Sequence, residues 1–176
     1  HVMSALGLYP GSLPEEFAAL VWEGRIGSFY VGREGGLDLK RIPVMSHPGG
    51  KYSSLMALAD PTFPDLANPR HDYAGKLMAL AAYGDLGDAT DEDRGVVERL
   101  LLLDRLFPFD KGQFRGRHLY SCGIEDPRFR AAAKLLSNRM FEEFARAATV
   151  FVEPVPLLVA GGCGLNCDWN TAWVRS

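Results

Sequence analysis

Three glycines and an asparagine follow a short apolar run near the end of the chain. Residues 157–160 are apolar and bounded by turn-forming residues, so they predict a core strand covered on both faces. The residues that follow predict a glycine turn leading into a helix. Such a turn exposes backbone N–H groups that suit a phosphate or a ribose, but a tight turn without a ligand has the same signature. The candidate ligand-binding residues are Gly161, Gly162, Gly164 and Asn166.

A second candidate group lies near the start of the chain. Residues 18–22 and 26–31 read as two strands of a hairpin, and we expect Gly24 to supply a positive φ in the turn between them. Glu23 lies where the first strand ends. It is either a solvated turn acid or a ligand for a metal or for phosphate-bound water. His1 is the other candidate metal ligand, unless it is a tag remnant or a solvated terminal residue.

A lysine interrupts an otherwise apolar helical segment at residues 73–83. We expect Asp72 to cap this helix and Gly84 to close it at the C′ position. The segment is apolar on every side except at Lys76, which predicts a buried helix. A lysine on such a helix either extends its ammonium to solvent or meets an anion.

The remaining patterns predict long helices combined with short strands, an α/β or α+β fold with mixed sheets. Thr90 with Asp93 resembles a capping arrangement, and Asp126 before Pro127 marks a strong helix start. The expected elements are a first helix within residues 1–10, a third strand at 37–42, a loop at 47–51, and helices at 52–59, 90–106, 126–148 and from about 169 onward.

Composition predicts one globular core in a chain of 176 residues with 47% hydrophobic and 23% charged residues. The net charge is −3 and Lys/Arg blocks are absent from the sequence, so we expect no nucleic-acid partner. We also expect no membrane span and no signal peptide. The odd set Cys122, Cys163 and Cys167 predicts reduced thiols in a cytoplasm. A zinc pair at Cys163 and Cys167 lacks a second Cys/His pair nearby.

Four segments together resemble the O-carbamoyltransferases of nodulation proteins and antibiotics. Residues 74–84 are similar to a signature of that family, and residues 160–167 resemble its later AGG-x-x-LN segment. Residues 20–27 lie where the family has its second phosphate-side hairpin, and residues 1–5 resemble the end of its His-x-x-x-His metal motif. The order and spacing of the segments agree across essentially the whole chain.

The resemblance implies an actin-like fold of the sugar-kinase and Hsp70 ATPase type (ribonuclease H-like), related to the threonylcarbamoyl transferase of tRNA. It implies transfer of a carbamoyl group from carbamoyl-adenylate to a hydroxyl of a small-molecule acceptor. A separate domain would make that adenylate from carbamoyl phosphate and ATP. By the resemblance, a divalent metal such as iron binds His1 and Glu23, and the nucleotide binds Gly24, Lys76 and the residues of the glycine turn; the catalytic base is not identified.

The chain also departs from the family pattern. The first histidine of the motif would lie before His1, and the last metal carboxylate would lie beyond Ser176. Glu23 replaces the usual Asp, and the first phosphate-binding hairpin is missing. We therefore interpret residues 1–176 as a single fragment from the centre of the carbamoyl-transfer domain, inactive alone and without a tightly bound metal.

Three other interpretations differ in chemistry. An actin-like kinase or ATPase would use Glu23–Gly24 and Gly161–Gly162 for ATP with Mg²⁺ and no histidine ligand. A non-catalytic domain would bind only a protein partner. A dinucleotide-binding Rossmann turn is disfavoured because Cys167 occupies the position of the third glycine.

Overall fold

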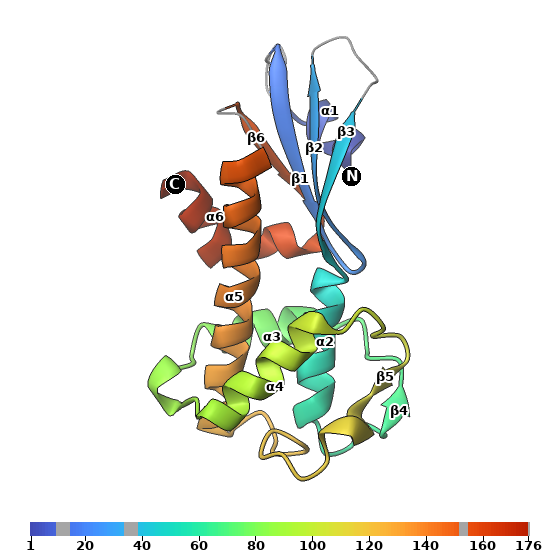
Figure 1. Cartoon of the computed structure of the whole chain (residues 1–176), viewed down its shortest axis with the longest axis vertical. Coiled ribbons are helices and arrows are strands. Elements are labelled where there is room, and N and C mark those ends of the chain that lie inside the picture. Colours follow the sequence, from blue (N-terminus) through green and yellow to red (C-terminus); the bar gives the residue numbers. More distant parts are fainter. Residues whose placement is uncertain (10–14, 34–38, 152–154, 176) are drawn as a thin grey trace. The chain divides into compact units, whose positions relative to one another are not determined.

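A computed structural model of the chain describes residues 1–9, 15–33, 39–151 and 155–175 (Figure 1). The helices are α1 (Val2–Gly7), α2 (Pro48–Ala59), α3 (Tyr73–Ala81), α4 (Asp91–Leu102), α5 (Pro127–Phe151) and α6 (Cys167–Arg175), with short 3-10 turns η1 (Leu86–Asp88), η2 (Lys111–Phe114) and η3 (Gly162–Leu165). The strands are β1 (Glu16–Trp22), β2 (Ile26–Arg33), β3 (Lys40–Ser46), β4 (Leu66–Ala67), β5 (Phe109–Asp110) and β6 (Leu157–Ala160). The expected mixture of helices and a mixed sheet is confirmed.

The chain folds into two compact units. Unit 1 comprises residues 1–48 and 141–176, and unit 2 comprises residues 49–140. Within the described residues, every helix is too short or too polar to cross a bilayer.

Unit 1 is built on a four-stranded sheet with the order β3-β2-β1-β6. The first three strands are antiparallel, as the hairpin pattern predicts, whereas β6 pairs with β1 in parallel, Val21 opposite Ala160. The third strand begins at Lys40, later than expected, and positions 37 and 38 lie outside the described residues. Parallel pairing requires the chain to return over a long crossover, and unit 2 lies within that crossover in the sequence.

The strand β6 differs from its expected environment. It lies at the edge of the sheet, and its residues are all partly exposed rather than buried on both faces. A run of four apolar residues predicts a strand but does not show whether a neighbour covers each face. The expected strand is confirmed, and its expected full burial is wrong.

An aromatic cluster forms the core of unit 1. Trp22 is fully buried, with its ring centroid 4.2 Å from that of Trp169 and 4.8 Å from that of Phe144. Packed aromatic pairs stabilise a core by about 1 kcal/mol each beyond the area they bury. The cluster therefore fixes the end of β1 against α5 and α6.

Unit 2 is helical, and well-formed caps set its helix starts. Thr90 and Asp93 make a complete capping box at the start of α4, and the Asp126 carboxylate accepts from the backbone N–H groups of Arg128 and Phe129 at the start of α5. Each such cap contributes about 1 kcal/mol. Both caps confirm predictions from the sequence. By contrast α2 begins at Pro48 rather than Tyr52, because proline is well suited to the first helical position.

Two buried lysines in unit 2 bind backbone carbonyls. Lys51 is 1% exposed and donates to Leu101 O at 2.8 Å and Leu103 O at 3.0 Å, where α4 ends. Burial lowers the pKa of Lys51 to about 8, and the Asp104 carboxylate acts in the opposite direction. Lys111 donates to Asp60 O and Phe63 O, and burial lowers its pKa. These cations satisfy carbonyls that would otherwise be buried without donors.

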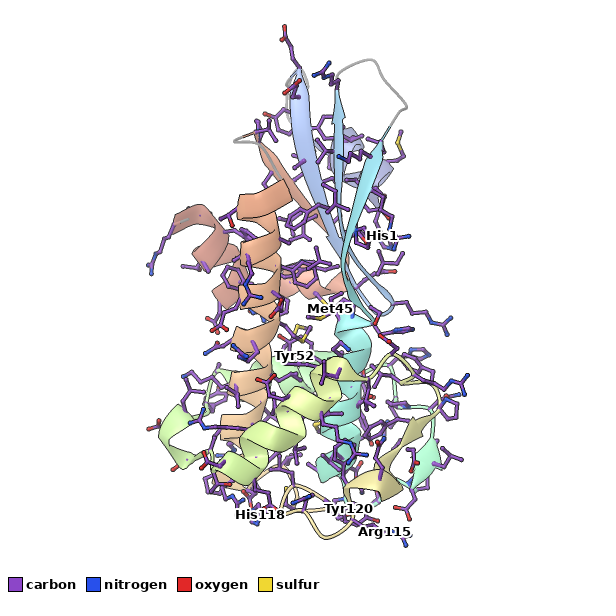
Figure 2. The ribbon with its side chains drawn as sticks, in the orientation of Figure 1. His1, Met45, Tyr52, Arg115, His118 and Tyr120 are labelled. Carbon is purple, nitrogen blue, oxygen red and sulfur yellow. The ribbon has the colours of Figure 1, made fainter. Side chains whose placement is uncertain are left out.

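An acidic residue joins several loops of the same unit. The Asp65 carboxylate accepts from Tyr120 and from Arg115, and Figure 2 shows the two donors next to each other. Both hydrogen bonds hold the pKa of Asp65 below its usual range, with Tyr120 the larger cause. The segment after η2 is thereby anchored to the loop before β4.

The helix α3 is not buried all round, which corrects the expectation for residues 73–83. Tyr73, Leu77 and Ala81 are its buried positions, and the other residues of the helix are at least partly exposed. Asp72 occupies the N-cap position, but its side chain makes no capping hydrogen bond. A helix of mostly alanine and leucine reads as apolar on every side even when one face meets solvent.

Gly84 does not close α3 in the left-handed conformation. The helix ends at Ala81, and the φ of Gly84 lies outside the left-handed range. A Cβ atom on Gly84 would lie 2.2 Å from the carbonyl oxygen of Arg130. Gly84 is therefore required because the backbone of α5 passes directly against it.

Replacing Gly84 with alanine should destabilise unit 2 by about 1–3 kcal/mol, since the new methyl group meets a backbone atom that cannot move aside. Gly75→Ala is the matched control, because a Cβ there meets nothing within 4 Å and the helix gains up to about 1 kcal/mol. Urea unfolding followed by far-ultraviolet circular dichroism measures both. Equal stability of the two variants would contradict the close contact.

Candidate functional site

The glycine turn and Glu23 lie together at one edge of the sheet of unit 1. Because β1 and β6 are parallel neighbours, their carboxyl ends meet at the same edge, with Glu23 just beyond β1 and Gly161 just beyond β6. Ligands of mixed and parallel sheets commonly bind outside these carboxyl ends. The topology therefore brings together two of the candidate groups that the sequence separates by more than a hundred positions.

Gly161 has the positive-φ backbone of the turn. Its φ is +99°, and a Cβ atom there would lie 2.4 Å from the carbonyl oxygen of Trp22 and 3.2 Å from Cβ of Glu23. Only glycine adopts this conformation at low cost and also allows the close approach. Gly161 is thus a structural residue that joins the turn to the end of β1.

Gly162 has the opposite surroundings. It is exposed, its φ lies outside the left-handed range, and a Cβ atom there meets no heavy atom within 4 Å. Gly162 opens η3, and the first N–H groups of such a turn have no acceptor within it. The open space beside Gly162 is therefore where a ligand could approach the backbone.

Gly164 and Asn166 serve mainly to shape the turn. A Cβ atom on Gly164 would lie 3.2 Å from a methyl carbon of Val159. The side-chain oxygen of Asn166 accepts from the N–H groups of Asp168 and Trp169, so Asn166 is the N-cap of α6. The amide oxygen of Asn166 is consequently committed to the helix rather than directed to a ligand.

His1 and Glu23 meet directly. His1 Nε2 lies 2.8 Å from Glu23 Oε2, and about a third of the Glu23 side chain is exposed. Figure 2 labels His1, which directly precedes α1, and α1 contacts β1 and β6. The expected proximity of His1 and Glu23 is confirmed. Their role as metal ligands stays a prediction.

The described residues contain no cluster of three or more His, Cys, Asp or Glu side chains suited to a metal ion. Protein sites for first-row metals use at least three ligands, so His1 and Glu23 form part of such a site and do not complete one. We therefore derive no catalytic step through a metal. The three cysteines are free.

Gly24 and Lys76 have other surroundings than the sequence suggests. Gly24 is exposed at the hairpin tip, and its φ lies outside the left-handed range, so the expected positive φ is wrong. The turn instead closes through the N–H of Glu23, which donates to Ile26 O at 2.8 Å.

Lys76 belongs to unit 2, is 53% exposed, and pairs with Asp72 at 2.7 Å. The anion that Lys76 meets in this structure is therefore a neighbour on its own helix.

Trp22 is the residue that sequence reasoning missed. Its carbonyl meets Gly161, and its buried ring packs on Trp169 of α6, so it links both sides of the turn. The sequence signal for this role was a large aromatic residue at the end of a predicted strand, directly before Glu23. Its partners could not be identified because they lie almost 150 residues further along the chain.

The comparisons with known proteins match two enzymes along nearly the whole chain. Over 177 aligned residues covering 99% of this chain, it is 46% identical to the 3'-hydroxymethylcephem-O-carbamoyltransferase of Streptomyces clavuligerus and 47% identical to that of Amycolatopsis lactamdurans. The chain is thus similar along nearly its whole length to two enzymes named as O-carbamoyltransferases. The resemblance seen in the four sequence segments is thereby confirmed.

The chain spans about a third of the length of these O-carbamoyltransferases, 34% in each case. No protein-family model matches the chain.

The two turn glycines should respond differently to alanine. Gly161→Ala should destabilise unit 1 by at least about 2 kcal/mol, because positive φ and the Trp22 carbonyl both oppose a Cβ. Gly162→Ala should change stability by less than about 0.5 kcal/mol. All three tryptophans lie in unit 1, so unfolding followed by tryptophan fluorescence reports on that unit. Similar destabilisation by both changes would contradict this assignment.

Cys163 in the turn and Cys167 at the start of α6 should differ in reactivity. Burial, with a smaller contribution from the Glu23 charge, raises the pKa of Cys163 to about 12, so its thiol stays protonated well above neutral pH. Cys167 is exposed. Iodoacetamide at pH 8 should therefore label Cys167 first and Cys163 only after unfolding, as read by mass spectrometry. Cys167→Ser is the control that should remove the fast labelling, and rapid labelling of Cys163 would mean that the turn is open.

Proposed function

We propose that this chain is part of an enzyme that transfers a carbamoyl group to a hydroxyl of a small natural product. The observation that carries the proposal is the 46–47% identity, over 99% of the chain, to enzymes named for O-carbamoylation of 3'-hydroxymethylcephems. A primary hydroxyl such as the hydroxymethyl group of a cephem is the acceptor that these names favour. Identity at this level along the whole aligned length supports a shared architecture for the chemistry.

The proposed donor is carbamoyl-adenylate. The acceptor oxygen attacks the carbamoyl carbon, a new C–O bond forms, and the bond from that carbon to the phosphate oxygen breaks. Adenosine monophosphate leaves, and the hydroxyl proton passes to a base that the described residues do not identify. An adenylate-forming domain elsewhere in the protein would supply the donor from carbamoyl phosphate and ATP.

The turn at residues 161–166 is the proposed binding element for the adenylate phosphate. The support is the exposed position of Gly162 at the start of η3, with open space on the side where a Cβ would lie. Backbone N–H groups presented in this way stabilise a phosphate and the negative charge that develops as it leaves. Gly161 would hold the turn in place, and Gly24 would border the same edge from the hairpin tip.

The His1–Glu23 pair is the proposed partial site for a divalent metal, iron by resemblance. An imidazole nitrogen and a carboxylate oxygen suit such an ion, which when bound would stabilise negative charge on the donor. In this structure His1 Nε2 and Glu23 Oε2 lie 2.8 Å apart.

The proposed location is a reducing compartment such as the cytoplasm, in agreement with the three free thiols.

Gly162→Val should lower the affinity of the full-length protein for adenine nucleotide at least about tenfold and reduce carbamoyl transfer. A Cβ atom at position 162 meets no heavy atom within 4 Å, so folding should be unchanged. Calorimetric titration with AMP and ATP, together with a transfer assay on a hydroxymethylcephem, measures both effects.

Gly75→Val is the control for this experiment, because it adds the same side chain to an exposed position of α3 with nothing within 4 Å. It should leave nucleotide affinity and transfer as in the wild type. If Gly162→Val folds normally and binds nucleotide as tightly as the wild type, the turn has only a structural role. Loss of binding in both variants would also reject the assignment.

A further inference from the structure

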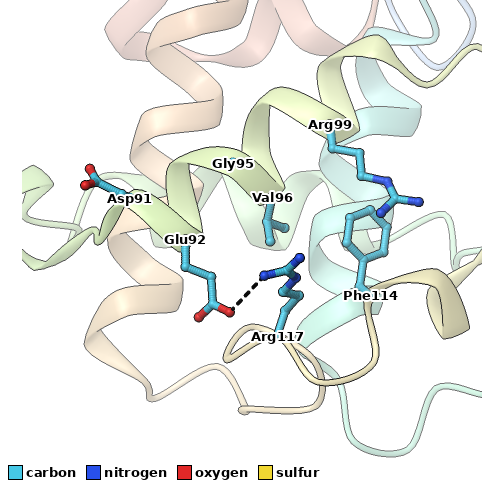
Figure 3. Close-up of a pocket in the computed structure, with 7 residues that line it drawn as sticks. All are labelled: Asp91, Glu92, Gly95, Val96, Arg99, Phe114 and Arg117. Atoms are coloured by element: carbon cyan, nitrogen blue, oxygen red, sulfur yellow. Dashed lines mark ion pairs between the residues drawn. The ribbon is translucent and has the colours of Figure 1, made fainter.

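A hollow of about 260 Å³ lies on unit 2, away from the glycine turn in sequence (Figure 3). One wall is α4, and the other is the segment from η2 to Arg117. Figure 3 shows Arg99 and Phe114 on one side and Arg117 extending between Phe114 and Glu92. The volume is near the lower end for ligand pockets, so a small molecule or one end of a larger molecule would fill it.

The base of this hollow is apolar and rigid. Val96 is 4% exposed and Phe114 is 1% exposed, and both belong to the core of unit 2. The Phe114 ring presents one face to Arg99, whose guanidinium carbon lies 5.1 Å from the ring centroid. The apolar part of a ligand would meet the small exposed parts of these two side chains and the aliphatic stem of Arg99.

Two guanidinium groups border the hollow without a strong anionic partner of their own. Arg99 donates to the neutral amide oxygen of Gln113 at 2.9 Å. Arg117 lies 3.5 Å from Glu92, which is an ion pair beyond ordinary hydrogen-bond length. Planar guanidinium groups bind carboxylates through two parallel hydrogen bonds, and neither contact here provides such a pairing.

The acidic start of α4 has a second cationic partner besides Arg117. Arg128 bonds the fully buried Asp93 at 2.9 Å and also contacts Glu92 at 3.3 Å. Burial opposes ionisation of Asp93, yet the hydrogen bonds from Arg128 and Thr90 hold its pKa below the usual range. Because Arg128 also contacts Glu92, Arg117 can turn from Glu92 to a ligand while Glu92 keeps a cationic neighbour. Asp91 is the other carboxylate that lines the hollow, and it is exposed to solvent, which screens its charge.

Gly95 keeps the hollow open on the side of α4. It lies in the middle of α4, where glycine weakens a helix relative to alanine, and it borders the hollow. A Cβ there would meet no heavy atom within 4 Å, so packing within the protein gives no reason for glycine. A side chain at this position would narrow the hollow.

We propose that this hollow binds a small carboxylate with a flat apolar body. The carboxylate lies between Arg99 and Arg117, and the apolar body packs on Val96 and Phe114 in the space that Gly95 leaves open. The site lies wholly within unit 2 and does not depend on the proposed carbamoyl transfer.

Calorimetric titration of the protein with 3-phenylpropionate, benzoate and cyclohexanecarboxylate tests the proposal, with 3-phenylpropanol as the uncharged counterpart of the first. At least one carboxylate should bind, and 3-phenylpropanol should bind at least about tenfold more weakly than 3-phenylpropionate. Absence of binding by all three carboxylates at about 10 mM would overturn the proposal, as would equal affinity for the acid and the alcohol.

Variants locate the binding site. Arg99→Gln and Arg117→Gln should each lower carboxylate affinity at least about tenfold, whereas Arg105→Gln, at an exposed arginine of unit 2 outside the hollow, should not. Gly95→Leu should abolish binding while keeping or raising the melting temperature, and Gly75→Leu should leave binding unchanged. Carboxylate binding that survives Arg99→Gln, Arg117→Gln and Gly95→Leu would show that the ligand binds elsewhere.

Discussion

The contact between Gly161 and the Trp22 carbonyl is the constraint on which the proposed site depends. The space left for a side chain at Gly161 is 2.4 Å from a backbone oxygen, so the turn can follow β6 only if that position has no Cβ. Once the contact forms, Glu23 and Gly162 are held at the same sheet edge, and the Trp22 ring is fixed against α6. The chemistry proposed at this edge thus depends on a glycine whose own role is structural.

Local signals in the sequence were sufficient for much of the fold. Helix caps are encoded within three or four residues, so the starts at Thr90 and Asp126 are confirmed. The hairpin of β1 and β2 is also confirmed, because two strand-forming runs are separated by only three residues. Errors arise where a distant partner decides the outcome. The exposed edge of β6 depends on which strand pairs with it, and the role of Gly84 depends on the backbone of Arg130.

The candidate site was predictable to a similar extent. The glycine turn can be predicted from the sequence. The different roles of Gly161, which packs against the Trp22 backbone, and Gly162, which faces open space, cannot be predicted because they depend on that distant backbone. The pairing of His1 with Glu23 was expected from resemblance and not from spacing. Lys76 and Asn166 illustrate the limit of residue type as a guide. Each has the polar group that a nucleotide site needs, and each uses it for its own helix.

The strand pairing at the site also has a consequence for how the protein is made. Ala18 pairs with Leu157, which lies 139 positions further along the chain, so the hairpin emerges from the ribosome long before its parallel neighbour exists. During that interval the free edge of β1 presents unpaired backbone groups, and such edges invite pairing with other chains. Pairing between such distant residues also slows the final step of folding. The compact helical unit, synthesised between these two strands, can fold first and thereby shorten the distance that β6 must search.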